Sequence, residues 1–206
     1  MRLLSLFKIW FYNHFKHVKI QGGADCSIGK LKLAVCGKNN LIHLGDNVRL
    51  ENVEIKIFGN NNHIFIDSYN TINGVRFAIE DDNNYITIGS HVYIGENSLL
   101  AALEGTKILI GKDCMIAGPC EMRTSDSHSL TDLEGNRINP AKDIEIGEHV
   151  WIGAGCMILK GCKIPSHSIV AARSLVTSTE TFESYSLWGG VPARLLKKNV
   201  NWKKER

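Results

Sequence analysis

The sequence predicts an all-β solenoid in which short strands turn a corner every six residues. The clearest evidence is residues 144–176, which read IEIGEHVWIGAGCMILKGCKIPSHSIVAARSLV. Apolar residues recur there at every sixth position: Ile146, Ile152, Ile158, Ile164, Val170 and Val176. Neither the 3.6 period of helices nor the 2.0 period of strands explains a period of six. The residue after each of these positions is mostly small or suited to a turn, and 19 glycines against four prolines suit many tight corners.

Length and charge set further bounds. The chain has 206 residues, enough for one domain with a substantial core. Its formal net charge is only +3, so nothing in the composition demands nucleic acid as a partner. Four of the six cysteines share one repeat position: Cys114, Cys120, Cys156 and Cys162. We therefore expect small buried wall residues with free thiols, in a reducing compartment.

Residues 1–20, MRLLSLFKIWFYNHFKHVKI, predict an N-terminal helix. Lysines interrupt the apolar residues, so the segment lacks the roughly 20 uninterrupted apolar residues of a transmembrane helix. No small-residue cleavage site follows, which argues against a signal peptide. The helix either covers the open end of the solenoid, joins a subunit contact, or lies as an amphipathic helix on a membrane.

Residues 21–178 are expected to form the solenoid. The repeat is degenerate up to Asn84, where GKNN at Gly37 and GNNN at Gly59 punctuate the strands and residues 81–84 form a polar structural turn. A clean phase of six begins at Ile88, AALEGTK shifts it at a wider corner, and Ile110 resumes it. Because the phase carries across from Ile116 to Ile146, residues 123–143 are expected to leave the solenoid and re-enter it in register.

Residues 123–143 are the functional candidate, since long loops in regular repeats are usually functional or mobile. The loop carries a dense polar set: Arg123, Asp126, His128, Glu134, Arg137 and Asn139. After Val176 the repeat dissolves. Residues 179–206, ending in GGVPARLLKKNVNWKKER, predict a turn and a short basic C-terminal helix.

The motifs TSDSH, GNRIN, VWIG and GGVPARLLKK, together with the hexapeptide repeat, resemble the left-handed β-helix acyltransferases, in particular the sugar and polysaccharide O-acetyltransferases. The resemblance is specific over residues 108–202. It implies a left-handed parallel β-helix and an acetyl-CoA-dependent transfer to a carbohydrate hydroxyl. The implied acceptor is a capsular or surface polysaccharide, with sialic acid polymers among the candidates. The loop length and GNRIN resemble the capsule-modifying branch.

The resemblance implies that His128 is the general base, because imidazole titrates near neutral pH. It would remove the proton of the acceptor hydroxyl, which attacks the thioester directly without an acyl-enzyme. Asp126, the second residue assigned to catalysis, could orient the imidazole, touch the acceptor, or cap the loop locally. The family's oxyanion donor falls on Gly95, where a backbone amide would have to serve.

The cofactor site implied by the resemblance comprises Trp151, Ala154, Ala172, Thr177, Arg194 and Lys197. Trp151 precedes an inward isoleucine, so it should point outward, where a subunit contact or the cofactor would cover it. The family's usual lysine is replaced by Ser178, which weakens the assignment of the phosphate contacts. Lys160 also faces outward and could be solvated, contact another subunit or contact a ligand.

Several alternatives remain open at this stage. An N-acetyltransferase of a nucleotide-linked amino sugar would use the same histidine chemistry, and a non-catalytic scaffold would share the fold. A zinc hydratase is disfavoured because no histidine lies five residues after His128, and we expect no metal. The resemblance also implies a homotrimer with its sites shared between subunits, in the cytoplasm or at the inner face of the membrane.

Overall fold

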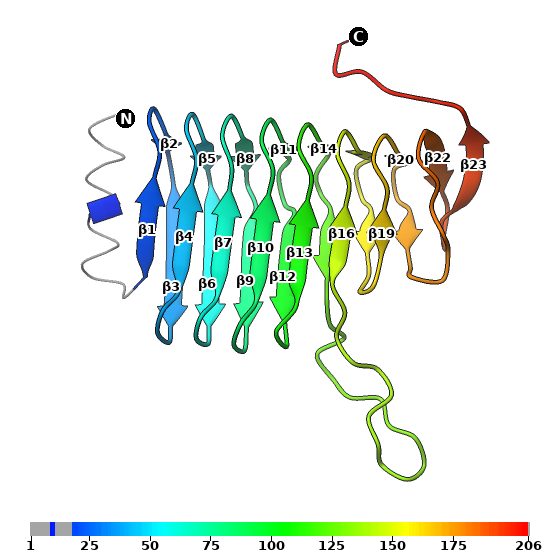
Figure 1. Cartoon of the computed structure of the whole chain (residues 1–206), viewed down its shortest axis with the longest axis horizontal. Helices are drawn as coiled ribbons and strands as arrows, with labels where there is room; N and C mark the ends of the chain where they lie inside the picture. Colours follow the sequence, from blue (N-terminus) through cyan, green and yellow to red (C-terminus); the bar gives the residue numbers. More distant parts are fainter. Residues whose placement is uncertain (1–8, 11–17, 206) are drawn as a thin grey trace.

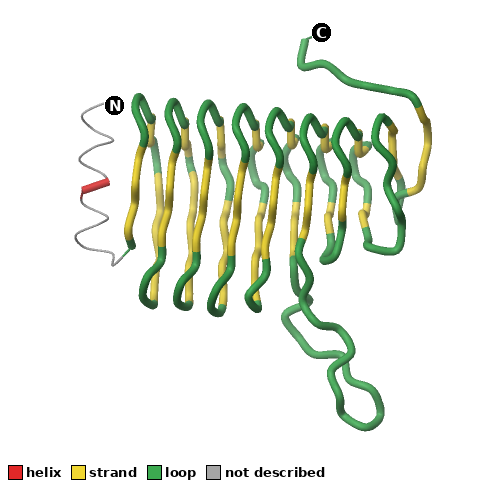
Figure 2. Tube along the Cα trace, in the orientation of Figure 1, coloured by secondary structure: helices red, strands yellow, loops and turns green. Residues whose placement is uncertain are grey.

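The computed structural model describes residues 9–10 and 18–205 as a parallel β-solenoid (Figure 1). Successive strands pass in turn to three sheets that run along its length (Figure 2). The all-β solenoid predicted from the six-residue period is therefore confirmed. Most of the predicted N-terminal helix lies outside the described residues. Ile9 and Trp10 are helical, Ile9 belongs to the core, and the first strand already begins at Lys19.

The first sheet has seven strands, all parallel: β1 (Lys19–Gly22), β4 (Leu41–Leu44), β7 (His63–Ile66), β10 (Tyr85–Ile88), β13 (Lys107–Ile110), β16 (Ile144–Ile146) and β19 (Lys163–Ile164). The third sheet also has seven: β3 (Leu31–Cys36), β6 (Val53–Phe58), β9 (Arg76–Glu80), β12 (Leu99–Leu103), β15 (Glu121–Arg123), β18 (Met157–Ile158) and β21 (Leu175–Val176).

The second sheet has nine strands: β2 (Ser27–Ile28), β5 (Arg49–Glu51), β8 (Thr71–Asn73), β11 (Tyr93–Ile94), β14 (Met115–Ile116), β17 (Trp151–Ile152), β20 (Ile169–Val170), β22 (Ser186–Gly189) and β23 (Arg194–Lys198). Alternate residues of each strand point inward, so equivalent apolar side chains stack from turn to turn. Ile42, Ile64, Ile86, Ile108 and Ile144 form one such row, and all are buried. No turn could bury its apolar face without its neighbours.

The early turns are regular, although their sequence repeat looked degenerate. Equivalent residues lie 22 positions apart there, as in the pairing of Lys19 with Leu41, but 18 positions apart near the C-terminus, as in the pairing of Glu145 with Lys163. The four additional residues lengthen the third-sheet strands and the corner that follows them. Figure 1 shows these longer turns reaching further down than the C-terminal ones. The phase shift predicted at AALEGTK is the last of these long corners.

A ladder of buried asparagines holds the long corners together. The side-chain Oδ1 of Asn40 accepts a hydrogen bond from the backbone N–H of Asn62 (2.9 Å), and that of Asn62 accepts one from Asn84 (2.8 Å). The Nδ2 groups of Asn40 and Asn62 donate to backbone carbonyls in the corner of the next turn, as from Asn62 to Asp81 at 2.9 Å. All three side chains are buried. The structural role predicted for residues 81–84 is confirmed.

The C-terminal end differs from the prediction. Residues 194–198 form β23, an antiparallel edge strand beside β22, so the predicted basic helix is wrong. Gly190, with φ +104°, lies in the turn that reverses the chain between these strands. RLLKK is too short to hold a helix alone, whereas β22 offers it a ready ladder of backbone partners. Phe182 stacks on Trp188 at 4.2 Å between ring centroids, and both rings cover the end of the core.

Candidate functional site

Residues 124–143 leave the solenoid after β15 and return at β16, which resumes pairing with β13 in register (Figure 1). We call this segment the excursion loop. It begins at the corner between the third and first sheets, and its return in register agrees with the prediction for residues 123–143. Its base is tied to the solenoid by the backbone N–H of Lys142, which donates to Thr124 at 2.9 Å.

Asp126 stands at the centre of a polar network at the base of the excursion loop. Its carboxylate accepts hydrogen bonds from Lys160 Nζ (2.6 Å) and Asn139 Nδ2 (2.7 Å). Lys160 also donates to the carbonyl of Asn139 at 2.9 Å, and only 18% of its side chain is exposed. Lys160 therefore has an intramolecular partner instead of being solvated. Among the described residues, no hydrogen bond joins the Asp126 carboxylate to the imidazole of His128, and its bonds to Asn139 and Lys160 hold the excursion loop.

A second ion pair holds the returning part of the excursion loop, at Arg137, to the solenoid. Arg137 donates from both terminal nitrogens to Glu104, at 2.5 and 3.0 Å, across 33 positions of sequence. Glu104 also accepts a hydrogen bond from Ser125 at 2.5 Å. Bidentate pairing fixes orientation as well as distance. The loop is thus held at both of its ends by charged groups on turns of the solenoid.

Both clamping carboxyls are shifted toward the ionised form. Hydrogen bonds from Lys160 and Asn139 hold the pKa of Asp126 below its ordinary value. Hydrogen bonds from Arg137 and Ser125 lower the pKa of Glu104 in the same way. Hydrogen bonding to the charged form is the physical cause in both. The network is therefore ionic at neutral pH.

His128 lies on the segment that these clamps position. Its backbone N–H donates to the carbonyl of Asp126 (2.8 Å), and its carbonyl accepts from Asn139 Nδ2 (2.9 Å). The preceding Ser127 has φ +64°, which turns the chain sharply at this point. His128 is exposed, and in the described part of the chain no hydrogen bond engages its imidazole. A fixed backbone with a free, accessible imidazole can accept a proton from a bound ligand.

Trp151 lies on the outer face of the second sheet, with 37% of its surface exposed. Its partial cover comes from the same chain, because Trp202 of the C-terminal segment lies 6.1 Å away between ring centroids. Trp202 is itself buried, stacks on His149 at 4.5 Å and donates from Nε1 to the His149 carbonyl. Sequence reasoning missed this contact, since nothing in the repeat indicates where residues beyond it return.

The C-terminal segment is pinned to the corner between the first and second sheets. Lys204 and His149 both bond Asp113, at 2.6 and 2.5 Å. Burial alone would raise the pKa of Asp113, but the bonds from Lys204 and His149 outweigh it and lower that pKa. Trp202 is thereby placed beside Trp151.

Ala154 and Ala172 lie together at the corner between the second and third sheets. The backbone N–H of Arg173 donates to the carbonyl of Ala154 at 2.8 Å. This hydrogen bond joins the corners of two successive turns. Small residues keep the backbone open to close approach there. Thr177 follows β21 at the other corner, with its hydroxyl 2.7 Å from that of Thr179. The described chain therefore separates Thr177 from the two alanines.

Arg194 and Lys197 lie on β23 and are exposed. Arg194 pairs with Glu180 at 2.7 Å, whereas Lys197 lies opposite Leu187. Gly95 cannot supply the oxyanion donor suggested for it. Its N–H already donates to the carbonyl of Ile116 at 2.9 Å, and a Cβ there would lie 2.6 Å from Gly118 N.

The structure thus gathers the predicted residues into two places. Asp126 and His128 lie at the excursion loop, at the corner of the third and first sheets. Trp151, Ala154 and Ala172 lie on the second sheet and its corner with the third. In the described residues, no group of three or more histidine, cysteine or acidic side chains is arranged to hold a metal. Residues 9–10 and 18–205 contain no helix long and apolar enough to cross a membrane.

Comparison with known proteins finds similarity to acetyltransferases. A family model described as "Bacterial transferase hexapeptide (six repeats)" matches residues 143–178. The polysialic acid O-acetyltransferase of Neisseria meningitidis is 50% identical over 66 residues, which cover 32% of this chain and 31% of that protein. That of Escherichia coli O1:K1 / APEC is 34% identical over 119 residues, 55% of this chain and 38% of the relative. The chain therefore aligns with about a third of each relative's length.

Likeness to solved structures extends further along the chain. The crystal structure of the polysialic acid O-acetyltransferase OatWY has a TM-score of 0.79 and 30% identity, covering 92% of both chains. That of the polysialic acid-specific acetyltransferase NeuO has a TM-score of 0.61 and 27% identity, covering 92% of this chain and 90% of that one.

Proposed function

Because this chain belongs to the bacterial hexapeptide transferase family, we propose that it is an acetyl-CoA-dependent O-acetyltransferase that acts on an acidic polysaccharide. The observation that carries the proposal is the likeness to a polysialic acid O-acetyltransferase along nearly the whole of both chains. A polymer of sialic acid is accordingly the acceptor that we put first.

The excursion loop supports a direct transfer. The His128 imidazole removes the proton of an acceptor hydroxyl, whose oxygen attacks the carbonyl carbon of the acetyl thioester. The carbon–sulfur bond then breaks, and the leaving thiolate takes the proton back from the imidazolium. Every atom is accounted for without a covalent enzyme intermediate. Asp126, Lys160 and Asn139 act as positioning residues, because they fix the backbone that carries the imidazole.

The cysteines support the absence of an acyl-enzyme. Burial raises the pKa of Cys114 and of Cys162 to about 11, and that of Cys120 to about 12. A buried thiol that stays protonated is a poor nucleophile. These residues pack in the wall of the solenoid, where their small size suits the corner.

The separation of His128 from Trp151 within one chain supports a homotrimer. His128 and Trp151 lie on different sides of one chain. If one acetyl donor contacts both, the two residues must come from neighbouring chains. A neighbouring copy that presents its second sheet to the excursion loop would bring Trp151, Ala154 and Ala172 toward His128. We further propose that the enzyme works in the cytoplasm, where acetyl-CoA is supplied, with residues 1–20 as a candidate contact with the membrane.

The first test is thiol release from acetyl-CoA in the presence of a panel of acceptors: sialic acid polymers, neutral capsule sugars and amino sugars. We expect release with the sialic acid polymer and a loss of at least ~100-fold in kcat for His128→Ala, the size of a general-base contribution. His43→Ala changes a histidine on the outer face of the first sheet and serves as the matched control.

Each other outcome contradicts part of the proposal. Release that needs an amino sugar would identify an N-acetyltransferase instead. Acetyl-CoA binding with a fully active His128→Ala variant would remove the histidine from the mechanism. Absence of acetyl-CoA binding would leave a non-catalytic scaffold as the better description.

A further inference from the structure

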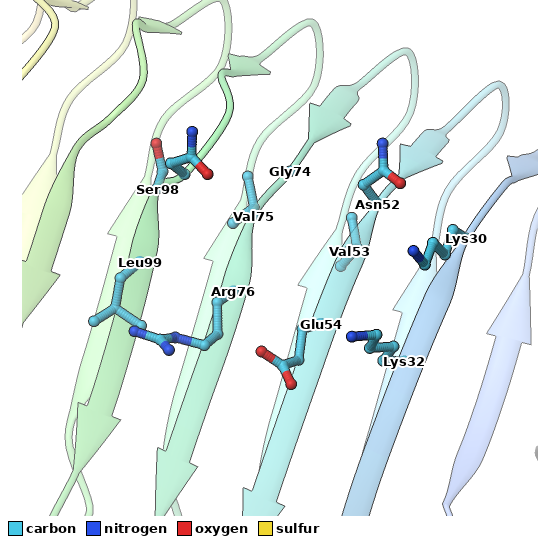
Figure 3. Close-up of a pocket in the computed structure, with 11 residues that line it drawn as sticks. Lys30, Lys32, Asn52, Val53, Glu54, Gly74, Val75, Arg76, Ser98 and Leu99 are labelled. Carbon is cyan, nitrogen blue, oxygen red and sulfur yellow. The ribbon is translucent and has the colours of Figure 1, made fainter.

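A trough lined by basic side chains runs along the edge of the third sheet, at its corner with the second sheet. Its N-terminal part is a cleft of about 370 Å³ lined by residues of β3, β6, β9 and β12 and of the corners before them. Figure 3 shows that Lys32, Glu54 and Arg76 project onto the same face from three neighbouring strands. Lys30 lies at the head of this cleft.

No ion pair engages Lys30, Lys32 or Arg76 in the described part of the chain. The one carboxylate in the lining, Glu54, is paired with Lys56 at 3.5 Å. Glu54 lies in register between Lys32 and Arg76, so the cleft holds three cations against one carboxylate and keeps a net positive charge that attracts an anion.

The cleft continues toward the cofactor residues. A second depression of about 280 Å³ shares Arg76, Asn97 and Leu99 with the first, so the two form one trough. Its far end is lined by Gly155 and Met157, directly after Ala154. From β3 to β18 the trough crosses six strands, about 24 Å at ~4.8 Å between neighbouring strands. That length exceeds a single sugar ring.

The remaining lining suits a carbohydrate. The amides of Asn52 and Asn97 are exposed at the corner, and in the described residues neither side chain has a hydrogen-bond partner. Leu99 is buried although it faces outward, and it forms an apolar floor where the two depressions meet. Amides for hydroxyls, an apolar floor for a ring face and cations for carboxylates match an acidic glycan.

We propose that this trough binds the acidic residues of the polysaccharide that lie beyond the one being acetylated. The inference rests on the proposed function, since it assigns a second, non-reacting contact to the same acceptor. Its consequence is a preference for long acceptors, because only a chain that reaches Arg76, Lys32 and Lys30 gains the additional electrostatic attraction. Nucleic acid is disfavoured as the occupant, because the whole chain carries a formal charge of only +3.

The decisive variants are Lys32→Glu and Arg76→Glu, with Lys38→Glu as control. Lys38 lies in the same turn as Lys32, at the opposite corner, so it brings the same charge change outside the trough. We expect the trough variants to raise KM for a sialic acid polymer about tenfold while leaving kcat, and the kinetics with a sialic acid dimer, unchanged. The control should keep the preference for the polymer.

Direct binding separates the two hypotheses. Fluorescence anisotropy with a labelled sialic acid polymer, without acetyl-CoA, should show weaker binding in both trough variants and a smaller salt dependence. Binding without any acetyl transfer would retain the trough and overturn the proposed function. Transfer by variants with unaltered polymer KM would overturn the trough. Equally tight binding of a DNA duplex, lost in the same variants, would also overturn the assignment to a glycan.

Discussion

Asp126 and Lys160 join two turns of the solenoid at the point where the excursion loop leaves it. Lys160 follows β18, whereas Asp126 follows β15 one turn earlier, so a single ion pair bridges the loop and the wall. Sequence reasoning identified both residues, but it could not join them, because they are 34 positions apart and the long loop intervenes. Arg137 was identified in the same way, but its partner Glu104, 33 positions away, was not. Contacts of this kind depend on how the turns stack.

Replacing Lys160 tests whether the clamp positions the histidine. Lys160→Ala should lower kcat by about tenfold with little change in KM for acetyl-CoA, since a displaced base weakens the transition state and not the ground state. Thermal unfolding should shift little. Lys163→Ala is the matched control, because that lysine pairs with Glu145 on the surface of the next strand. Equal kinetics in both variants would show that the clamp does not serve catalysis.

The clamp should open in acid. A carboxyl whose pKa is lower in the folded chain stabilises it above the unfolded value, which is about 4, and this contribution is lost as the pH falls through the folded value. The pKa values of Asp126 and Glu104 are both lowered by their partners. The two ion pairs should therefore hold the excursion loop at about pH 5–7. The loop should loosen as the pH falls below about 4.

A fluorescent label can follow this opening. Leu133 lies at the exposed end of the loop, and Leu133→Cys in a Cys36→Ser background gives one accessible thiol. Its anisotropy should stay level at neutral pH and fall in acid. The same label on an Asp126→Asn, Glu104→Gln chain should already be mobile at neutral pH. A label that reports one unchanging anisotropy in both chains would contradict the clamp.

At the scale of elements, two spacings of the repeat explain what the sequence could and could not indicate. Where a turn holds 18 residues, the six-residue period is directly readable, and the strands from Ile144 onward lie where it places them. Where a turn holds 22, the four additional residues break the phase, so regular turns look degenerate. The helix predicted to include residues 194–198 was wrong for another reason. Five residues are too few to hold a helix alone, and β22 offers them backbone partners as an edge strand.

The asparagine ladder should be a main source of stability in the long turns. Asn62→Ala removes the acceptor of the Asn84 N–H and the donor to the Asp81 carbonyl, both in buried surroundings. Two buried groups left unpaired should cost about 2–4 kcal/mol in the free energy of unfolding. Guanidinium denaturation measures this loss. Asn61→Gly, at a half-buried position with φ +56°, should cost far less.

For the whole molecule, the core seals the cysteines along its length. Cys36 is exposed, whereas the other five are buried. Iodoacetamide at pH 8 should therefore modify Cys36 in the native protein and all six cysteines after unfolding, as counted by mass spectrometry. A native protein that reacts at Cys120, whose pKa burial raises to about 12, would mean that the wall opens readily.

Because the early turns all have the same length, the solenoid can be shortened by one whole turn at a time. Residues 41–62 form one complete turn, because Lys19 pairs with Leu41 and Leu41 pairs with His63. Removing those 22 residues would place β3 beside β9 in the third sheet. Equivalent residues would still pair from turn to turn at every corner. The excursion loop would be untouched, yet the trough would lose one strand spacing of about 4.8 Å. Acceptor length would then be set by the number of turns, independently of the chemistry at His128.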